Sequence, residues 1–234
     1  MTTQEIMSQL EAMGNESTKK TLMKHGAREP FFGVKVEDLK KIVKIVKKDY
    51  KLSLELYATG NSDAMYLAGL IADEKKMTKD DLNNWAKGAY WYYISEFTVP
   101  WVAAESAYGI ELAKEWLNSK EETIVAAAWG TFAYTLSVKN DDEIDFDLFF
   151  SLLEKVEKEI HQSQNRVKYA MNNFVISVGS YYKPLAEKAM QVAEKIGKVN
   201  VILGSTACKV PIATEYIEKT VQRTQFKKRK SARC

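Results

Sequence analysis

The stretch Glu121-Glu-Thr-Ile-Val-Ala-Ala-Ala-Trp-Gly130 decides the fold of this chain, because two other stretches share its style. Asp63-Ala-Met-Tyr-Leu-Ala-Gly69 and Asn165-Arg-Val-Lys-Tyr-Ala-Met-Asn-Asn173 also combine helical periodicity with small residues, which let neighbouring helices approach closely. The three stretches begin about 40–60 residues apart, a spacing compatible with helical-hairpin repeats, one extra pair included, that stack into a curved solenoid. The concave surface of such an array, lined by the second helix of each pair, would suit an extended ligand.

The rest of the 234-residue chain also has a helical pattern. Only four prolines and eleven glycines interrupt it, and nearly every segment between them has helical periodicity. The sequence predicts helix N-caps followed by acidic residues at Asn61, Thr78 and Ser119. No run alternates with period two long enough to indicate a sheet. The sequence therefore predicts an all-α fold, and it disfavours a four-helix bundle because the helices are too many and too short.

The composition is that of a folded soluble protein, with 46% hydrophobic and 28% charged residues. No apolar run approaches the roughly 18 residues of a membrane span, and the N-terminus lacks the pattern of a secretory signal. Cys208 and Cys234 are too few for a disulfide framework. His25 and His161 have no acidic or cysteine partners at ligand spacing. We expect a cytoplasmic monomer that contains no metal or cofactor and has no contact with a membrane.

Charge is distributed unevenly along the chain. Residues 223–234 carry six basic residues and no acid, so the net charge of +3 leaves −3 for the first 222 residues. We therefore divide the chain into one helical-repeat domain, residues 1–222, and a basic tail, residues 223–234, that we expect to be flexible. The tail could contact nucleic-acid phosphates, or it could be a solvated, mobile terminus.

An aromatic segment, Ala89-Tyr-Trp-Tyr-Tyr-Ile-Ser-Glu-Phe-Thr-Val-Pro-Trp101, contains six aromatic rings and one carboxylate. Tyr92 and Glu96 are four residues apart, so on a helix they share one face. An aromatic surface beside an acid can hold a flat cationic group and stabilise positive charge that develops next to it. The alternative is an aromatic core helix whose Glu96 points at water.

Two further segments carry a resemblance to a known family. Phe31-Phe-Gly-Val-Lys-Val-Glu-Asp-Leu-Lys-Lys-Ile-Val-Lys44 resembles the opening signature of the DNA alkylation repair (AlkD-like) family, and Leu56-Tyr-Ala-Thr-Gly-Asn-Ser-Asp-Ala-Met-Tyr-Leu-Ala-Gly69 resembles the repeat that follows it. The helical segments at 90–101, 119–139 and 165–179 follow in the family's order and spacing. The resemblance implies an α-solenoid of HEAT-like helical-hairpin repeats with a concave, basic DNA-binding face. It also implies, for active members, a glycosylase that releases N3- and N7-alkylated purines.

The family's catalytic residues can be placed on this sequence, with changes. The resemblance puts Glu96 at the catalytic aspartate and Tyr92 at the functional tryptophan, which makes these two the candidate catalytic residues. A shift of one residue would put Ser95 at the acid position instead. Trp129 falls at the arginine that clamps DNA in active members. The residues expected to line the cleft are Trp91, Trp129, Ser95 and Asn173.

These changes have physical consequences for catalysis. Glutamate in place of aspartate moves the charge by one methylene, and a displacement of about 1 Å can cost on the order of a hundredfold in rate. Tryptophan in place of arginine removes a bidentate phosphate anchor and offers a stacking platform instead. Trp129 could equally be a core residue at a helix crossing.

Basic residues near the ends of the concave helices are the candidate phosphate contacts, and each could also be an ordinary solvated charge. They are Lys139, Arg166, Lys168 and Lys209. The sequence thus predicts a DNA-binding protein of the DNA alkylation repair family that acts on duplex, alkylated or branched DNA. Whether it is a glycosylase with altered catalytic residues or a non-catalytic binder of damaged or branched DNA stays open. The alternative from another functional class is an α-solenoid that binds a protein or peptide. A DNA-binding protein should lose affinity for DNA steeply as salt increases, whereas this alternative should not.

Overall fold

The computed structural model describes residues 1–233, and within that range it contains α-helices, short 3-10 and π-helical turns, and no strand. This confirms the all-α prediction. The α-helices are α1 (Thr3–Ala12), α2 (Glu16–Lys24), α3 (Val36–Val46), α4 (Tyr50–Ala58), α5 (Ser62–Ile71), α6 (Lys79–Gly88), α7 (Val99–Glu105), α8 (Gly109–Trp116), α9 (Glu122–Val138), α10 (Phe146–Glu159), α11 (Asn165–Tyr181), α12 (Ala186–Ile196) and α13 (Ala213–Thr224).

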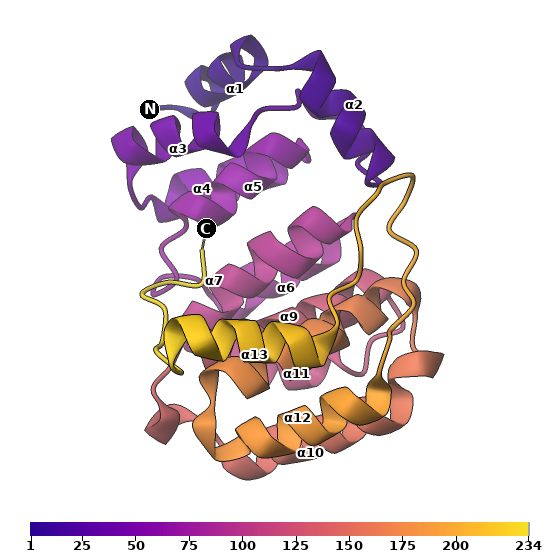
Figure 1. The fold of residues 1–234 in the computed structure, drawn as a ribbon. Coiled ribbons are helices and arrows are strands. Elements are labelled where there is room, and N and C mark those ends of the chain that lie inside the picture. The colour runs from indigo at the N-terminus through magenta and orange to yellow at the C-terminus, as the bar shows by residue number, and fades with distance from the viewer. Residues whose placement is uncertain (234) are drawn as a thin grey trace.

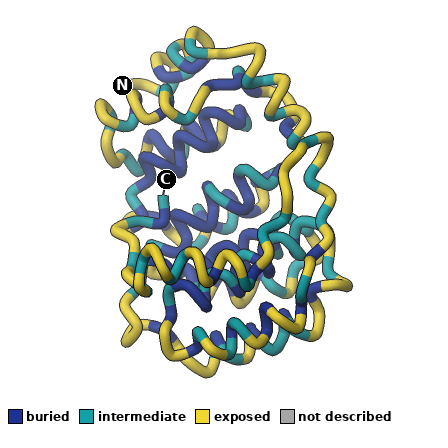
Figure 2. The backbone as a smooth tube through the Cα atoms, in the orientation of Figure 1, coloured by how far each residue is buried: buried dark blue, intermediate teal, exposed yellow. Residues whose placement is uncertain are grey.

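The helices stack as a solenoid. Helix α5, the π-helical turn η1 (Ile94–Thr98) with α7, then α9, α11 and α13 contact one another in that order and form an inner row. Helices α4, α8 and α12 pack against members of this row as the outer halves of helical hairpins. Figure 1 shows the pairs following one another along an arc from the indigo N-terminus to the orange and yellow C-terminal helices. Figure 2 shows that α5 and the middle of the solenoid are mostly buried, whereas α13 is largely exposed or half-buried.

Glycines lie where inner helices cross. A Cβ atom at Gly69 of α5 would stand 2.7 Å from the Thr98 side chain of η1, and one at Gly130 of α9 would stand 2.8 Å from the Pro100 ring of α7. At the next crossing, a Cβ at Gly179 of α11 would stand 2.7 Å from Ile217 of α13. The small residues of the sequence repeat therefore permit close helix approach, as the repeat pattern predicted.

A buried carboxylate joins the first two family-like segments. Asp63, in the first turn of α5, accepts hydrogen bonds from the backbone N–H groups of Phe32, Gly33 and Val34 at 2.6, 3.0 and 3.1 Å. Asp63 is only 5% exposed, so these three bonds replace its lost hydration. The interaction fixes the turn that precedes α3 against the start of α5.

The segment between α12 and α13 reaches the opposite end of the arc. Its Ile202 exchanges two hydrogen bonds with the Asn165 side chain at the start of α11, at 2.8 and 2.7 Å. Its Ser205 N–H donates to the carbonyl of Lys24 at the end of α2, at 3.2 Å. Figure 1 shows this long connection passing beside α2. The segment consequently bridges the last repeat and the first helices.

The basic tail, which we expected to be flexible from its composition, follows the C-terminal ends of the inner helices. The Lys228 ammonium donates to the carbonyls of Leu136 and Tyr181 at 2.9 and 2.7 Å. The guanidinium of Arg233 contacts the Ala72 carbonyl at 2.8 Å and the carboxylate of Glu74 at 2.9 Å. Cations are stabilised at helix C-termini because the last carbonyl groups there are unpaired. The tail therefore fastens α5, α9 and α11 together.

We expect Arg233→Gln to lower the free energy of unfolding by about 3 kcal/mol, because it leaves the partly buried Glu105 without its cation and Glu74 with Lys48 as its remaining cation. Arg233 is only 9% exposed and lies between Glu74 and Glu105, at 2.9 and 3.3 Å. Urea unfolding monitored by circular dichroism measures the change. The control is Arg223→Gln, the same substitution at an exposed position of α13. Equal stability of the two variants would contradict the fastening role of the tail.

Candidate functional site

The site is built around an ion pair between two distant parts of the chain. Glu96 lies in η1 and Arg166 lies in the first turn of α11. The Nε atom of Arg166 is 2.6 Å from Oε1 of Glu96, and its Nη2 atom is 2.6 Å from Oε2. The Glu96 side chain is 5% exposed and the Arg166 side chain is 16% exposed. This bidentate geometry is the strongest arrangement available to a carboxylate and a guanidinium, and it occupies both carboxylate oxygens.

Two tyrosine rings flank the guanidinium. The Arg166 Cζ atom is 4.2 Å from the ring centroid of Tyr92 and 4.6 Å from that of Tyr169. The Arg166 backbone N–H also donates to Oε1 of Glu122 at 2.7 Å, which fixes the start of α11 against the start of α9. Arginine is well suited to this position because its flat, weakly hydrated cation stacks on rings while its N–H groups bind a carboxylate.

The sequence predicted that Tyr92 and Glu96 together could hold a flat cationic group. The structure brings the two side chains together on one face, and the flat cation that they hold is Arg166 of the same chain. Arg166 was expected to contact phosphate, but its guanidinium is instead engaged by the acid and the two rings. Nothing in the sequence pattern linked it to Glu96, 70 positions away.

Burial raises the pKa of the Glu96 carboxyl to about 7, while its hydrogen bonds and charge attraction to Arg166 act in the opposite direction. The folded-state pKa thus lies above the ordinary value of 4.5. A group of this kind stabilises the fold most at acidic pH, and its contribution is lost as the pH rises through about 7. Burial also raises the pKa values of Tyr92 and Tyr169, so both phenols stay neutral at physiological pH.

The remaining predicted cleft residues separate into two groups. Trp129 is 1% exposed and packs edge-on against Phe174, so it is a core residue, and its ring lines neither of the two hollows beside the Glu96–Arg166 pair. The reason is the face of α9 on which it lies, since the neighbouring Gly130 occupies the side toward Glu96. Ser95 is 1% exposed, and its hydroxyl has no hydrogen-bond partner within residues 1–233. Glu96, and not Ser95, is the residue that η1 turns toward α11.

Trp91 and Asn173 line two different hollows, one on each side of the Glu96–Arg166 pair. The indole N–H of Trp91 donates to the Ser62 hydroxyl at 2.9 Å, and the ring is 5% exposed beside a hollow lined also by Tyr92 and Arg166. Asn173 is half-buried two turns after Arg166 on α11, and it lines a second pocket together with Glu96.

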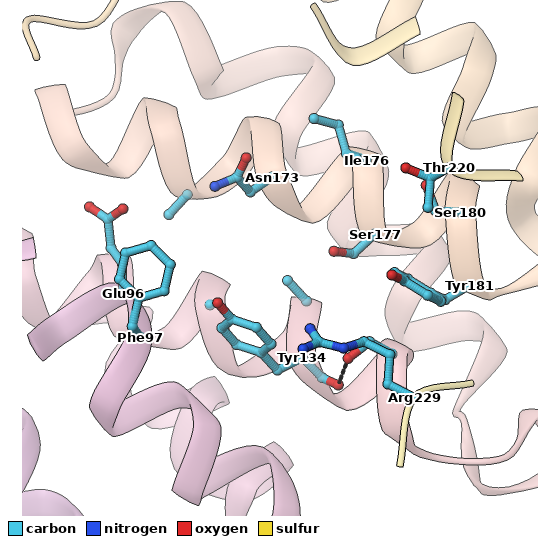
Figure 3. A pocket seen from close by; sticks show the side chains of 14 residues that line it. Glu96, Phe97, Tyr134, Asn173, Ile176, Ser177, Ser180, Tyr181, Thr220 and Arg229 are labelled. Atoms are coloured by element: carbon cyan, nitrogen blue, oxygen red, sulfur yellow. Dashed lines mark hydrogen bonds between the residues drawn. The ribbon is translucent and has the colours of Figure 1, made fainter. Parts of the chain in front are cut away.

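This second pocket has a volume of about 220 Å³ and lies between α9, α11 and α13, with η1 at one end and the tail at the other. Figure 3 shows Glu96, Phe97 and Asn173 at one end and Tyr181, Thr220 and Arg229 at the other. Of the residues that line this pocket, only Glu96 and Asn173 were predicted from the sequence as site residues. The spacing of Asn173 and Ser177 on one face of α11 was the available signal, but polar residues at that spacing also occur on any solvated helix.

The predicted phosphate contacts other than Arg166 lie on the surface. The Nζ atom of Lys139 is 3.4 Å from Oε1 of Glu143 in an exposed ion pair. Such a pair contributes little free energy, so Lys139 could exchange Glu143 for a phosphate at little cost. Lys168 is half-buried in the first turn of α11, and Lys209 is exposed in the connection between α12 and α13. Neither of these two lysines has a salt-bridge partner in the part of the chain that the structure describes.

Between residues 1 and 233 no group of three or more histidine, cysteine, aspartate or glutamate side chains could hold a metal ion. In the same range no helix combines the length and the apolar character that crossing a membrane requires.

Comparison with known proteins places the chain in a family. A family model described as DNA alkylation repair enzyme matches residues 6–216, so the chain belongs to this family, as the resemblance predicted. Uncharacterized protein Lmo0209 of Listeria monocytogenes is 32% identical over 231 residues, which cover 96% of this chain and 100% of that protein. Uncharacterized protein Lin0241 of Listeria innocua is 32% identical over 229 residues, covering 95% and 99%.

A solved structure also matches over 100% of both chains, with 39% sequence identity and a TM-score of 0.91. It is described as representing a new family of proteins related to the HEAT-like repeat DNA glycosylases, with affinity for branched DNA structures. The agreement confirms the HEAT-like solenoid fold of the present chain.

We expect Arg166→Met to raise the pKa of Glu96 above about 7, because it removes the hydrogen bonds and the positive charge that lower it. Carboxyl ¹³C NMR titration of glutamate-labelled protein measures this pKa. The loss of stability relative to wild type should be smaller at pH 6 than at pH 9. Between the two Glu96 pKa values it should increase by about 1.4 kcal/mol per pH unit.

The control is a Glu96→Gln/Arg166→Met double variant, which has no carboxyl at this place. Its loss of stability relative to Glu96→Gln should not vary with pH. An unchanged Glu96 pKa in Arg166→Met would show that the two side chains do not interact in solution.

Proposed function

We propose that this protein binds branched or damaged DNA along its concave face, as a cytoplasmic monomer, and does not excise bases by means of Glu96. The observation that carries the proposal is the bidentate pairing of Glu96 with Arg166, beneath Tyr92 and beside Tyr169. The constellation that would act on an alkylated nucleotide is occupied by a side chain of the protein itself.

Catalysis by Glu96 would require a free carboxylate oxygen. Stabilising an oxocarbenium-like sugar and positioning water both need a carboxylate lone pair directed at the substrate. Both oxygens of Glu96 accept charged hydrogen bonds at 2.6 Å. Breaking such a buried pair costs about 3–5 kcal/mol. A barrier increase of that size would lower the rate of a reaction that needed the free acid by about 100- to 5,000-fold.

Binding to DNA is supported by the family and by the surface charges near the groove. The similar solved structure represents proteins with affinity for branched DNA structures, and the similarity covers the whole chain. Lys168 and Lys209 lie near the starts of α11 and α13, where helix N-termini add backbone donors for phosphate. These features favour DNA over a protein ligand for the concave face.

We expect the wild-type protein to release no N7-methylguanine or N3-methyladenine from alkylated duplex DNA above the spontaneous rate. Chromatography of released bases measures this, with Glu96→Gln as the matched variant of equal size. In the same preparation, electrophoretic binding at low salt should give a higher affinity for a flap duplex than for a linear duplex. Base release that Glu96→Gln abolishes would overturn the proposal, because it would require Arg166 to leave the acid during the reaction.

We expect Lys168→Gln and Lys209→Gln each to weaken DNA binding by a similar factor on flap and linear duplexes. Each should also reduce the slope of log affinity against log salt by about 1, since one phosphate contact is lost. Lys40→Gln and Lys44→Gln are the matched controls, on the exposed polar face of α3, and should leave affinity and slope unchanged. A slope that is nearly flat for the wild-type protein would favour a protein ligand instead.

A further inference from the structure

The pocket between α9, α11 and α13 has two chemically different ends. At the η1 end it is lined by the ring of Phe97, the small side chains of Ala133 and Ala170, and the amide of Asn173. At the tail end it is lined by Ser180, Thr220, Tyr181 and Arg229, that is, by hydroxyl groups and a cation. Figure 3 shows these two groups of side chains at opposite ends of the pocket.

Two polar groups of the tail end lack partners within residues 1–233. The Ser180 hydroxyl is fully buried and makes no hydrogen bond. A buried hydroxyl without a partner is destabilising unless a ligand or water supplies one. The guanidinium of exposed Arg229 forms no ion pair, although its backbone N–H donates to the Ser137 carbonyl at 2.7 Å. Figure 3 shows the Arg229 side chain directed toward Tyr134, over the pocket.

The dimensions restrict what this pocket can accept. Its volume of about 220 Å³ lies below the roughly 300–1,000 Å³ of pockets that take drug-sized ligands, so it can enclose one base, while the sugar and phosphate attached to that base would stay at its open side. Its walls include the half-buried rings of Phe97 and Tyr134, and Asn173 and Ser177 are half-buried too, so the pocket is open to the outside. Asn173 and Ser177 follow Arg166 at helical spacing on α11, which places the pocket along the same surface as the Glu96–Arg166 pair.

We propose that this pocket binds one unpaired nucleotide of a branched DNA strand, with the base at the Phe97–Asn173 end and its phosphate at Arg229. A ring and an amide are the groups that stack on a base and bond its edge, and a guanidinium with hydroxyls is what binds a phosphate. The inference rests on the proposed function and adds the site that distinguishes branched from linear DNA. A fully paired duplex has no free nucleotide to fill the pocket, so only the branched form gains this contact.

The test uses the full-length protein and two fluorescent DNA probes of equal length. One is a flap duplex with 2-aminopurine as the unpaired nucleotide at the branch point, and the other is a linear duplex with 2-aminopurine in a base pair. Ser177→Leu fills the pocket and Arg229→Gln removes its cation. The matched control is Lys227→Gln, which removes one charge from an exposed neighbouring position that does not line the pocket.

Ser177→Leu and Arg229→Gln should each weaken flap binding about tenfold, the loss expected for one base contact, and leave linear-duplex binding unchanged. Both should also suppress the change in 2-aminopurine fluorescence that wild-type protein produces on the flap probe. Lys227→Gln should lower affinity for both probes by the same factor. Ser180→Ala should weaken flap binding while the Tm stays equal or rises, which a purely structural hydroxyl would not do.

An unchanged flap-to-linear affinity ratio in Ser177→Leu and Arg229→Gln would overturn the pocket assignment while leaving DNA binding in place. Arg229 is exposed, so its variant decides the question even if Ser177→Leu fails to fold. Absence of wild-type binding to either probe at low salt would instead overturn the proposed function, and the nucleotide site with it.

Discussion

Close approach of the inner helices is the constraint on which the rest of the structure depends. Gly69 and Gly130 leave room for Thr98 and Pro100 at distances that a Cβ atom would close. A larger side chain would have to displace a helix backbone or a rigid proline ring, and packed interiors absorb little of such strain. These contacts hold η1 between α5 and α9, and they determine where the aromatic segment lies relative to later repeats.

The same spacing explains how an acid and an arginine 70 positions apart form a buried pair. Both η1 and α11 pack on α9, whose groove side carries Gly130 and Ala133 in place of bulky side chains. Arg166 therefore reaches Glu96 across α9, and Tyr92 and Tyr169 cover the guanidinium. The pair acts as a brace between two repeats, because its separation would leave a buried charge without a partner.

The fold could be predicted from local signals, whereas the site could not. Helical periodicity, caps such as Thr78 and the repeated small residues are properties of short segments, and they specified helical hairpins and their stacking. The partner of Arg166 depends on which helix faces meet across α9, and that information is not local. Trp129 illustrates the same difficulty, since a one-residue change of helix phase separates the core face from the groove face, where Gly130 lies. The contacts of the tail could not be predicted either, because its composition does not show that helix C-termini can accept its cations.

Several cationic side chains form bonds within the protein and are therefore not available to attract DNA. Arg166, Lys228 and Arg233 are bound to carboxylates or helix carbonyls, so their charge contributes little to an external field. In the function proposed above, the charges that would release counterions from DNA include half-buried Lys168, exposed Lys209 and the exposed Lys227 and Arg229 of the tail. Such peripheral contacts give affinity without regard to strand geometry, because every duplex presents phosphates. Under the proposed function, discrimination between DNA forms would therefore come from groups inside the concave face, where only a strand that leaves the duplex can reach them.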